Sequence, residues 1–308
     1  MSRLQSIRSW ASRISSSPSG RKFIKVVRVL LGVAVVSLLV WQLSNIGWSD
    51  LLDEMPRTPW FYVIVVAMYV VLPFTETAIY GSFWDTKKSA LLSVFFRKKV
   101  LNSDLMGYSG DVYVAFWAKE NTGHSQGKIL RLMVDNGIMS SLGALTATGV
   151  LFGILLGTAS IQMPDVLAQQ DGTVYFGALV VALVLSWVGY RFRHAIFSLP
   201  GKSILALYGT HFTRFMVMFV LQVLQWWVVL PETPFHIWGT MLAIVTVTNR
   251  LPFLAGRDLV ATSIILGIGG LLGPAETAVA AMLVTRSVLE RVFNLFLFVP
   301  LSLADKSK

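Results

Sequence analysis

The chain has 308 residues, of which 55% are hydrophobic and only 14% are charged, against about 25% charged residues in an average soluble domain. A mean hydropathy of +0.66 over the whole length exceeds what one apolar segment of about 20 residues supplies, which excludes a soluble enzyme domain and a single membrane anchor. The net charge of +10 is typical of basic loops facing anionic lipid rather than of nucleic-acid binding.

The first 25 residues are basic and contain no acidic residue, which predicts a cytoplasmic location. Apolar residues recur there at spacings of three and four, as in an amphipathic helix lying on anionic headgroups: Leu4, Ile7, Ala11 and Ile14. An organelle transit peptide has a similar composition. We expect the surface helix, because the first apolar stretch follows so closely.

Residues 26–303 are expected to form a single transmembrane domain, with a short basic tail over 304–308. Five apolar stretches are long enough to cross about 30 Å of hydrocarbon: Val26–Ser44, Trp60–Tyr80, Ile138–Gly157, Val174–Tyr190 and Phe215–Leu230. Two shorter runs predict a re-entrant pair or an interfacial helix: Ala90–Phe96 and Met106–Phe116. The last third predicts broken or tilted helices: Ile237–Asn249, Leu259–Leu272 and the charge-interrupted stretch Thr277–Leu303.

The charges of the connecting segments assign the sides of the membrane. Acidic residues predominate after the first stretch and basic residues after the second, and this alternation continues through five stretches. We therefore expect an all-α polytopic integral membrane helix bundle of about eight spans. Both termini, and residues 81 to 128, are placed on the cytoplasmic side of a bacterial inner membrane.

Two segments of similar sequence lie in helix-breaking regions. In each, an asparagine precedes an aspartate by nine residues and a glycine lies just ahead of the aspartate; Gly110 and Gly256 are these glycines. Interrupted apolar segments in corresponding halves of a chain indicate a transporter's binding site, although the match is short enough to arise by coincidence. The candidate substrate-binding residues are Asn102, Asp111, Asn249, Arg250, Arg257 and Asp258.

Charged residues inside apolar stretches cost at least about 2.5 kcal/mol each at the bilayer centre unless they are paired or hydrated. Three carboxylates are candidate coupling or cavity groups: Glu76, Asp135 and Glu290. Pro73 is expected to kink the helix that carries Glu76. Arg286 is a further candidate for binding an anionic headgroup, but Glu290 lies four residues away and the two can instead neutralise each other.

No catalytic or metal-binding grouping is recognised in the sequence. The chain has no cysteine, and its four histidines offer no pair at metal-ligand spacing: His124, His194, His211 and His236. We therefore expect no metal and no cofactor.

The Gly110–Asp111 pair, Asp135 at the start of a long apolar stretch, Leu251–Pro252 with Gly256, and Arg286 in the last stretch follow one another along the chain. This order resembles the lysylphosphatidylglycerol synthase transmembrane region, a flippase-like integral membrane family, over about residues 25–300. The resemblance implies translocation of lipids or lipid-linked headgroups. The chain departs from the family after the proline, where it has Ala255-Gly256-Arg257-Asp258 in place of a glycine-rich stretch, which suggests that an anionic headgroup meets Arg257.

The expected function is translocation of an anionic phospholipid or a lipid-linked sugar between membrane leaflets. One alternative is a membrane-embedded enzyme that modifies a lipid headgroup with Asp111 or Glu76 as its base, and another is a non-transporting partner in an envelope-synthesis complex. The expected partners are anionic lipids or lipid-linked glycans, with envelope-biosynthesis enzymes and a second copy of the chain as further candidates. Nucleic acid is not an expected partner.

Overall fold

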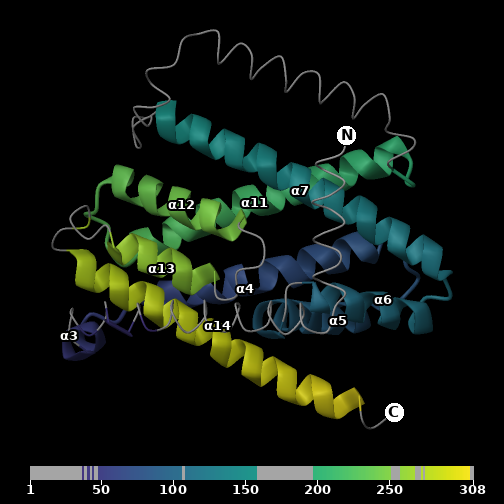
Figure 1. Cartoon of the computed structure of the whole chain (residues 1–308), viewed down its shortest axis with the longest axis horizontal. Helices are drawn as coiled ribbons and strands as arrows, with labels where there is room; N and C mark the ends of the chain where they lie inside the picture. The colour runs from purple at the N-terminus through teal and green to yellow at the C-terminus, as the bar shows by residue number, and fades with distance from the viewer. Residues whose placement is uncertain are drawn as a thin grey trace, which may run out of the picture. The chain divides into compact units, whose positions relative to one another are not determined.

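A computed structural model describes residues 37, 40, 41, 44, 48–105, 108–157, 197–250, 257–267, 272 and 275–305. Every regular element within these ranges is a helix (Figure 1), which confirms the all-α expectation. The predicted N-terminal surface helix, most of the first apolar stretch and the stretch Val174–Tyr190 lie outside the described residues.

Three of the described helices are long and apolar enough to cross a membrane: α4 (Pro59–Tyr80), α7 (Gln126–Gly157, apolar over Gln126–Leu155) and α11 (Gly201–Trp227). Helix α4 coincides with the predicted stretch Trp60–Tyr80. Helices α7 and α11 begin well before residues 138 and 215, where the apolar stretches predict their starts. The difference arises because the first turns of both helices contain polar residues, which hydropathy excludes. Hydropathy detects only the apolar part of a helix, and the polar turns continue it.

The irregular last third of the sequence forms three helices, α12 (Phe235–Arg250), α13 (Arg257–Gly267) and α14 (Glu276–Asp305). A short helix, α3 (Trp48–Asp53), precedes α4. The chain divides into two compact units, one formed by Met1–Met55 with Val247–Ser287 and the other by Pro56–Thr246 with Val288–Lys308. In the first unit, Leu266 of α13 packs against Ala280, Ala281 and Val284 of α14.

In the second unit, α11 packs against both α7 and α4. A glycine permits the close approach of α7 to α11, because a Cβ atom at Gly143 would lie 2.9 Å from the backbone nitrogen of Phe212. One buried polar side chain from each of the three long helices then joins a hydrogen-bonded chain. The hydroxyl of Tyr80 accepts from Asn136 Nδ2 at 3.4 Å, and Asn136 Oδ1 lies 2.8 Å from His211 Nε2. Such polar contacts hold apolar helices together where no water is present.

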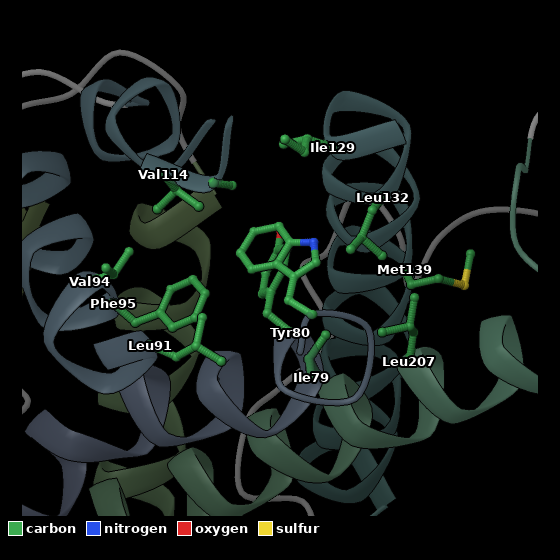
Figure 2. Packing of buried hydrophobic residues seen from close by; sticks show 12 residues of the cluster. Ile79, Tyr80, Leu91, Val94, Phe95, Val114, Ile129, Leu132, Met139 and Leu207 are labelled. Carbon is green, nitrogen blue, oxygen red and sulfur yellow. The ribbon is translucent and has the colours of Figure 1, made fainter. Parts of the chain in front are cut away.

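A hydrophobic cluster surrounds the end of α4. Figure 2 shows Tyr80 between Leu91 and Phe95 on one side and Leu132 and Met139 of α7 on the other. The rings of Tyr80 and Phe95 have their centroids 5.1 Å apart. The cluster fixes α4 against the residues that follow it in the chain, which carry the candidate site.

Candidate functional site

The two short apolar runs after α4 form a helical hairpin. It consists of α5 (Lys88–Val100), the single π-helical turn η1 (Leu101–Leu105) and α6 (Ser109–Asn121). Helix α5 packs against both α6 and α4, and the three helices are labelled in Figure 1. Each hairpin helix has 13 residues and is about 20 Å long at 1.5 Å per residue, which is too short to cross the hydrocarbon.

The matched asparagine and aspartate of the first segment meet at the apex of this hairpin. Asn102 Oδ1 accepts a hydrogen bond from the backbone nitrogen of Gly110 at 2.7 Å, and its Nδ2 donates to Asp111 Oδ2 at 3.1 Å. Ser109 Oγ donates to the carbonyl of Leu101 at 2.7 Å. The end of α5 thus provides an acceptor for a backbone N–H at the start of α6, and the start of α6 provides a donor for a backbone carbonyl at the end of α5. These contacts explain the nine-residue spacing.

The reversal requires a glycine at position 110. A Cβ atom added to Gly110 would collide with the carbonyl oxygen of Lys98 and lie 2.8 Å from its Cα atom. The residue that precedes α6, Tyr108, has a φ of 71°, in the left-handed region that a tight change of direction imposes. The Gly110–Asp111 pair thus closes the hairpin onto Lys98.

The centre of the site is the ammonium group of Lys98. Its Nζ lies 2.9 Å from Glu76 Oε2 and 3.0 Å from Asp111 Oδ1. The side chains of Lys98 and Glu76 are 10% and 6% exposed, whereas that of Asp111 is 33% exposed. The site thus holds an ammonium group between a buried and a partly exposed carboxylate.

A second lysine fixes the apex to the middle of α4. Pro73 has no backbone N–H, so the carbonyl of Tyr69, four residues earlier, lacks its helical donor. Lys99 Nζ donates to this carbonyl at 2.7 Å. The Tyr69 hydroxyl donates to Asn294 Oδ1 at 2.6 Å, and Asn294 Nδ2 donates to Ser103 Oγ at 3.0 Å. The turn of the hairpin therefore lies level with the midpoint of α4.

Asp135, one of the three candidate coupling or cavity carboxylates, contacts the segment that leads into α11. It lies inside α7 and is 1% exposed. One of its oxygens, Oδ2, accepts hydrogen bonds from the backbone nitrogen and the hydroxyl of Ser198, at 3.0 and 2.7 Å, and from the nitrogen of Leu199 at 3.1 Å. We assign Asp135 to holding the segment that leads into α11.

The second matched segment lies in the other unit. Asn249 is exposed near the end of α12, and Asp258 lies in the first turn of α13, as Asp111 lies in the first turn of α6. Asp258 Oδ2 accepts a hydrogen bond from Ser287 Oγ at 2.9 Å. The side chains of Arg250 and Arg257, and all of residues 251–256, lie outside the described part of the chain. A common cavity for Asp111 and Asp258 stays a prediction.

Arg286 and Glu290 both lie on α14, and both are half-buried. Their spacing of four residues puts them on one face of the helix. Whether Arg286 serves Glu290 or a headgroup stays a prediction that substitution tests.

Sequence reasoning identifies Glu76, Asn102 and Asp111 as candidates but misses Lys98, which pairs with Glu76 and Asp111. Lys98 lies in the basic run Arg97–Lys99, whose charge was attributed to a cytoplasmic loop. Lys98 lies four residues before Asn102, which puts both on one helical face. This spacing can be seen in the sequence and could have identified Lys98 as a candidate. Within the described ranges, no three histidine or carboxylate side chains lie close enough together to bind a metal ion.

Comparisons of the chain with protein-family models, curated proteins and solved structures gave no match.

Proposed function

We propose that the protein translocates an anionic phospholipid or a lipid-linked sugar between the leaflets of a bacterial inner membrane. This is the activity that the flippase-like resemblance implies. The proposal includes a bundle of about eight spans, of which α4, α7 and α11 are three, with both termini in the cytoplasm. The α5–α6 hairpin enters this bundle from the cytoplasmic side and turns back near the bilayer midplane.

One observation carries the proposal: a charged site just before the turn of a short hairpin, packed against the apolar helix α4 at Glu76, about one turn before that helix ends. The ion pairs of Lys98 with Glu76 and Asp111 lie at 2.9 and 3.0 Å, and Asp111 reaches the surface. Irregular backbone and charges are tolerated at membrane depth where they are buried in protein or line an aqueous cavity. A polar headgroup meets such a site only if it enters the membrane.

The mechanism that follows is shielding of the headgroup. The headgroup passes along the polar side chains of the hairpin apex while its acyl or prenyl tails stay in the bilayer. A charge is thereby moved between leaflets without being drawn through hydrocarbon, which is the step that makes unassisted translocation slow. Lys98 supplies the positive charge for an anionic headgroup, and Asn102 supplies hydrogen-bonding capacity beside it.

A vesicle assay tests this function. The full chain is reconstituted into liposomes containing a fluorescent phosphatidylglycerol, and an impermeant quencher measures how much of the headgroup becomes accessible. We expect accessibility to rise from the outer leaflet alone, about half of the lipid, toward all of it. Asp111→Asn and Lys98→Gln are expected to reduce the rate by about tenfold or more, and Asp258→Asn tests the second segment in the same way.

The matched control is Asp85→Asn, which makes the same chemical change at an exposed position away from the hairpin apex. It is expected to keep the wild-type rate. Full transport by Asp111→Asn would remove the main support for the site. Mass spectrometry of the lipids after the assay detects any modified headgroup, so an enzymatic activity is measured in the same samples.

A further inference from the structure

The charges around Lys98 do not sum to zero. Lys98 contributes one positive charge, and Glu76 and Asp111 contribute two negative charges, all within the contacts of 2.9 and 3.0 Å. The cluster therefore carries a net charge of about −1 when every group is ionised. An approaching anion therefore meets a site that is already negative. If the anion bound without a proton, the net charge of the cluster would become about −2 in a poorly hydrated region, which is unfavourable.

The two carboxylates differ in how easily they leave Lys98. Glu76 is buried on α4, and its side chain is 6% exposed. Asp111 is 33% exposed and begins α6, and Asn102 Nδ2 holds its other oxygen, Oδ2, at 3.1 Å. Protonation of Oδ1 breaks the ion pair with Lys98 and leaves the Asn102 contact in place.

The other titratable and charged groups that pack around the cluster have their own partners. Arg97 donates to the hydroxyl of Tyr113 at 3.0 Å, and Lys99 donates to the carbonyl of Tyr69 at 2.7 Å. Tyr80 of α4 and His211 of α11 are bonded to Asn136, and Arg214 donates to Ser140 Oγ at 3.2 Å. Lys98 pairs with two carboxylates, and one of them, Asp111, is partly exposed and accessible to a ligand.

We propose that the site binds one singly charged phosphodiester together with one proton, with the anion replacing Asp111 on Lys98 and the proton neutralising Asp111. The proton comes from solvent and forms an O–H bond at Asp111 Oδ1, and no other bond is made or broken. The protonated Oδ1 donates a hydrogen bond to the arriving anion. The net charge of the cluster is then about −1 before and after binding, so the step is electroneutral within the site. The inference deepens the proposed function, on which its biological meaning rests, by naming a proton as the coupled ion.

Calorimetry tests the inference without any transport. The detergent-solubilised full chain is titrated with short-chain phosphatidylglycerol in two buffers of different ionisation enthalpy, and the difference in heat gives the number of protons taken up. We expect about one proton per lipid bound, and an affinity that falls as the pH rises. Asp111→Asn, which is neutral at every pH, is expected to bind with no proton uptake and no pH dependence. Lys98→Gln is expected to lose binding at least tenfold.

Three other outcomes would contradict the inference or its assignment of the proton to Asp111. Lipid binding by the wild type without proton uptake overturns it, and this measurement needs no variant to fold. Uptake that persists in Asp111→Asn but disappears in Glu76→Gln moves the proton to Glu76 and refutes the assignment. Absence of anion binding overturns it altogether. Asp85→Asn is the matched control and is expected to keep about one proton per lipid.

Further titrants separate the source of the anion. Glycerol phosphate and inorganic phosphate test a free phosphate, and short-chain phosphatidylcholine tests a phosphodiester without net charge. Proton-linked binding of inorganic phosphate but not of phosphatidylglycerol would contradict the lipid source. Proton-linked binding of phosphatidylglycerol by a protein that moves no lipid in vesicles would leave the inference standing and refute the proposed transport.

Discussion

Lys99 donates a hydrogen bond of 2.7 Å to the backbone carbonyl of Tyr69, which is the carbonyl that Pro73 leaves without a helical donor. The ammonium group also lies 3.5 Å from the centroid of the Tyr69 ring, in the geometry of a cation–π contact. The hydrogen bond that Pro73 removes from α4 thus leaves a carbonyl to which Lys99 of α5 donates. This relationship sets the depth that the hairpin apex reaches along α4.

Replacing Lys99 by methionine is expected to destabilise the protein by about 1–3 kcal/mol, because the Tyr69 carbonyl then loses the hydrogen bond that this ammonium donates. Pro73→Ala supplies the missing N–H to the same carbonyl. In the double variant, the loss caused by Lys99→Met is therefore expected to shrink by about 1 kcal/mol or more. Denaturation of the detergent-solubilised protein measures all four corners of this double-mutant cycle.

Lys119→Met is the control for this cycle, since Lys119 is exposed on α6. It is expected to leave stability nearly unchanged with either residue at position 73. Equal losses from Lys99→Met in the presence and absence of Pro73 would show that the two residues act independently and would refute the attachment.

Gly110→Ala is expected to disrupt the hairpin, because the added methyl group collides with the backbone of Lys98. In an ordinary helical position, the same change stabilises by about 1 kcal/mol. Gly137→Ala is such a position, since no described atom lies within 4 Å of a Cβ there. We expect opposite signs for the two variants in thermal unfolding, with Gly110→Ala losing transport as well. A stable and active Gly110→Ala protein would contradict the geometry of the apex.

Local patterns were enough to predict much of this architecture. The apolar stretch Trp60–Tyr80 corresponds to α4 almost residue for residue, and the runs Ala90–Phe96 and Met106–Phe116, which predict a re-entrant pair or an interfacial helix, lie in α5 and at the start of α6. The nine-residue spacing of Asn102 and Asp111 corresponds to a hydrogen bond between them at the hairpin apex, while their role in binding stays a prediction. These features depend on neighbours along the chain, which a sequence displays directly.

Contacts between distant segments were not predictable in the same way. Lys98 reads as one member of a basic run, and only the packing of α5 on α4 brings it to Glu76. In the sequence, Asp135 is a charge beside an apolar stretch. Its partners in the structure, Ser198 and Leu199, lie more than sixty residues later in the chain. A buried charge in a sequence thus indicates that a partner exists without indicating whether that partner is a ligand or the fold itself.

The depth of the hairpin is testable with single cysteines, because the native sequence has none. Cysteines at Asp85 and Ser125, on either side of the hairpin, are expected to react with an impermeant reagent only from the cytoplasmic face, and one at Glu232 only from the outside. A cysteine at Ser2 should be protected in intact cells. A cysteine at Tyr108, which is 74% exposed at the apex, should react slowly or not at all from either face.

The Tyr108 position distinguishes the three arrangements of the hairpin. Fast labelling from the outside would mean that α5 and α6 both cross the membrane. Labelling from the cytoplasmic face as fast as at Ser125 would mean that the hairpin lies on the membrane surface. Labelling of Ser2 in intact cells would refute the cytoplasmic N-terminus.

Arg286 poses the last question, since a cation in the final apolar stretch is tolerated if it pairs with Glu290 or meets an anionic headgroup. If the two residues pair with each other, Arg286→Gln leaves Glu290 uncompensated and destabilises the protein by about 3–5 kcal/mol. Adding Glu290→Gln then restores stability and transport together. If Arg286 binds the headgroup, Arg286→Gln abolishes transport in a protein that stays folded, and the double variant remains inactive.

We expect the second pattern, and Arg286→Lys provides a further check on it. An ammonium keeps the positive charge but lacks the planar pair of donors with which a guanidinium holds two phosphate oxygens. Transport by Arg286→Lys should therefore be intermediate, while thermal unfolding stays close to that of the wild type. Full activity in the Arg286→Gln, Glu290→Gln double variant would instead assign Arg286 to the fold, and the headgroup would then have to be held by Lys98 at the hairpin apex.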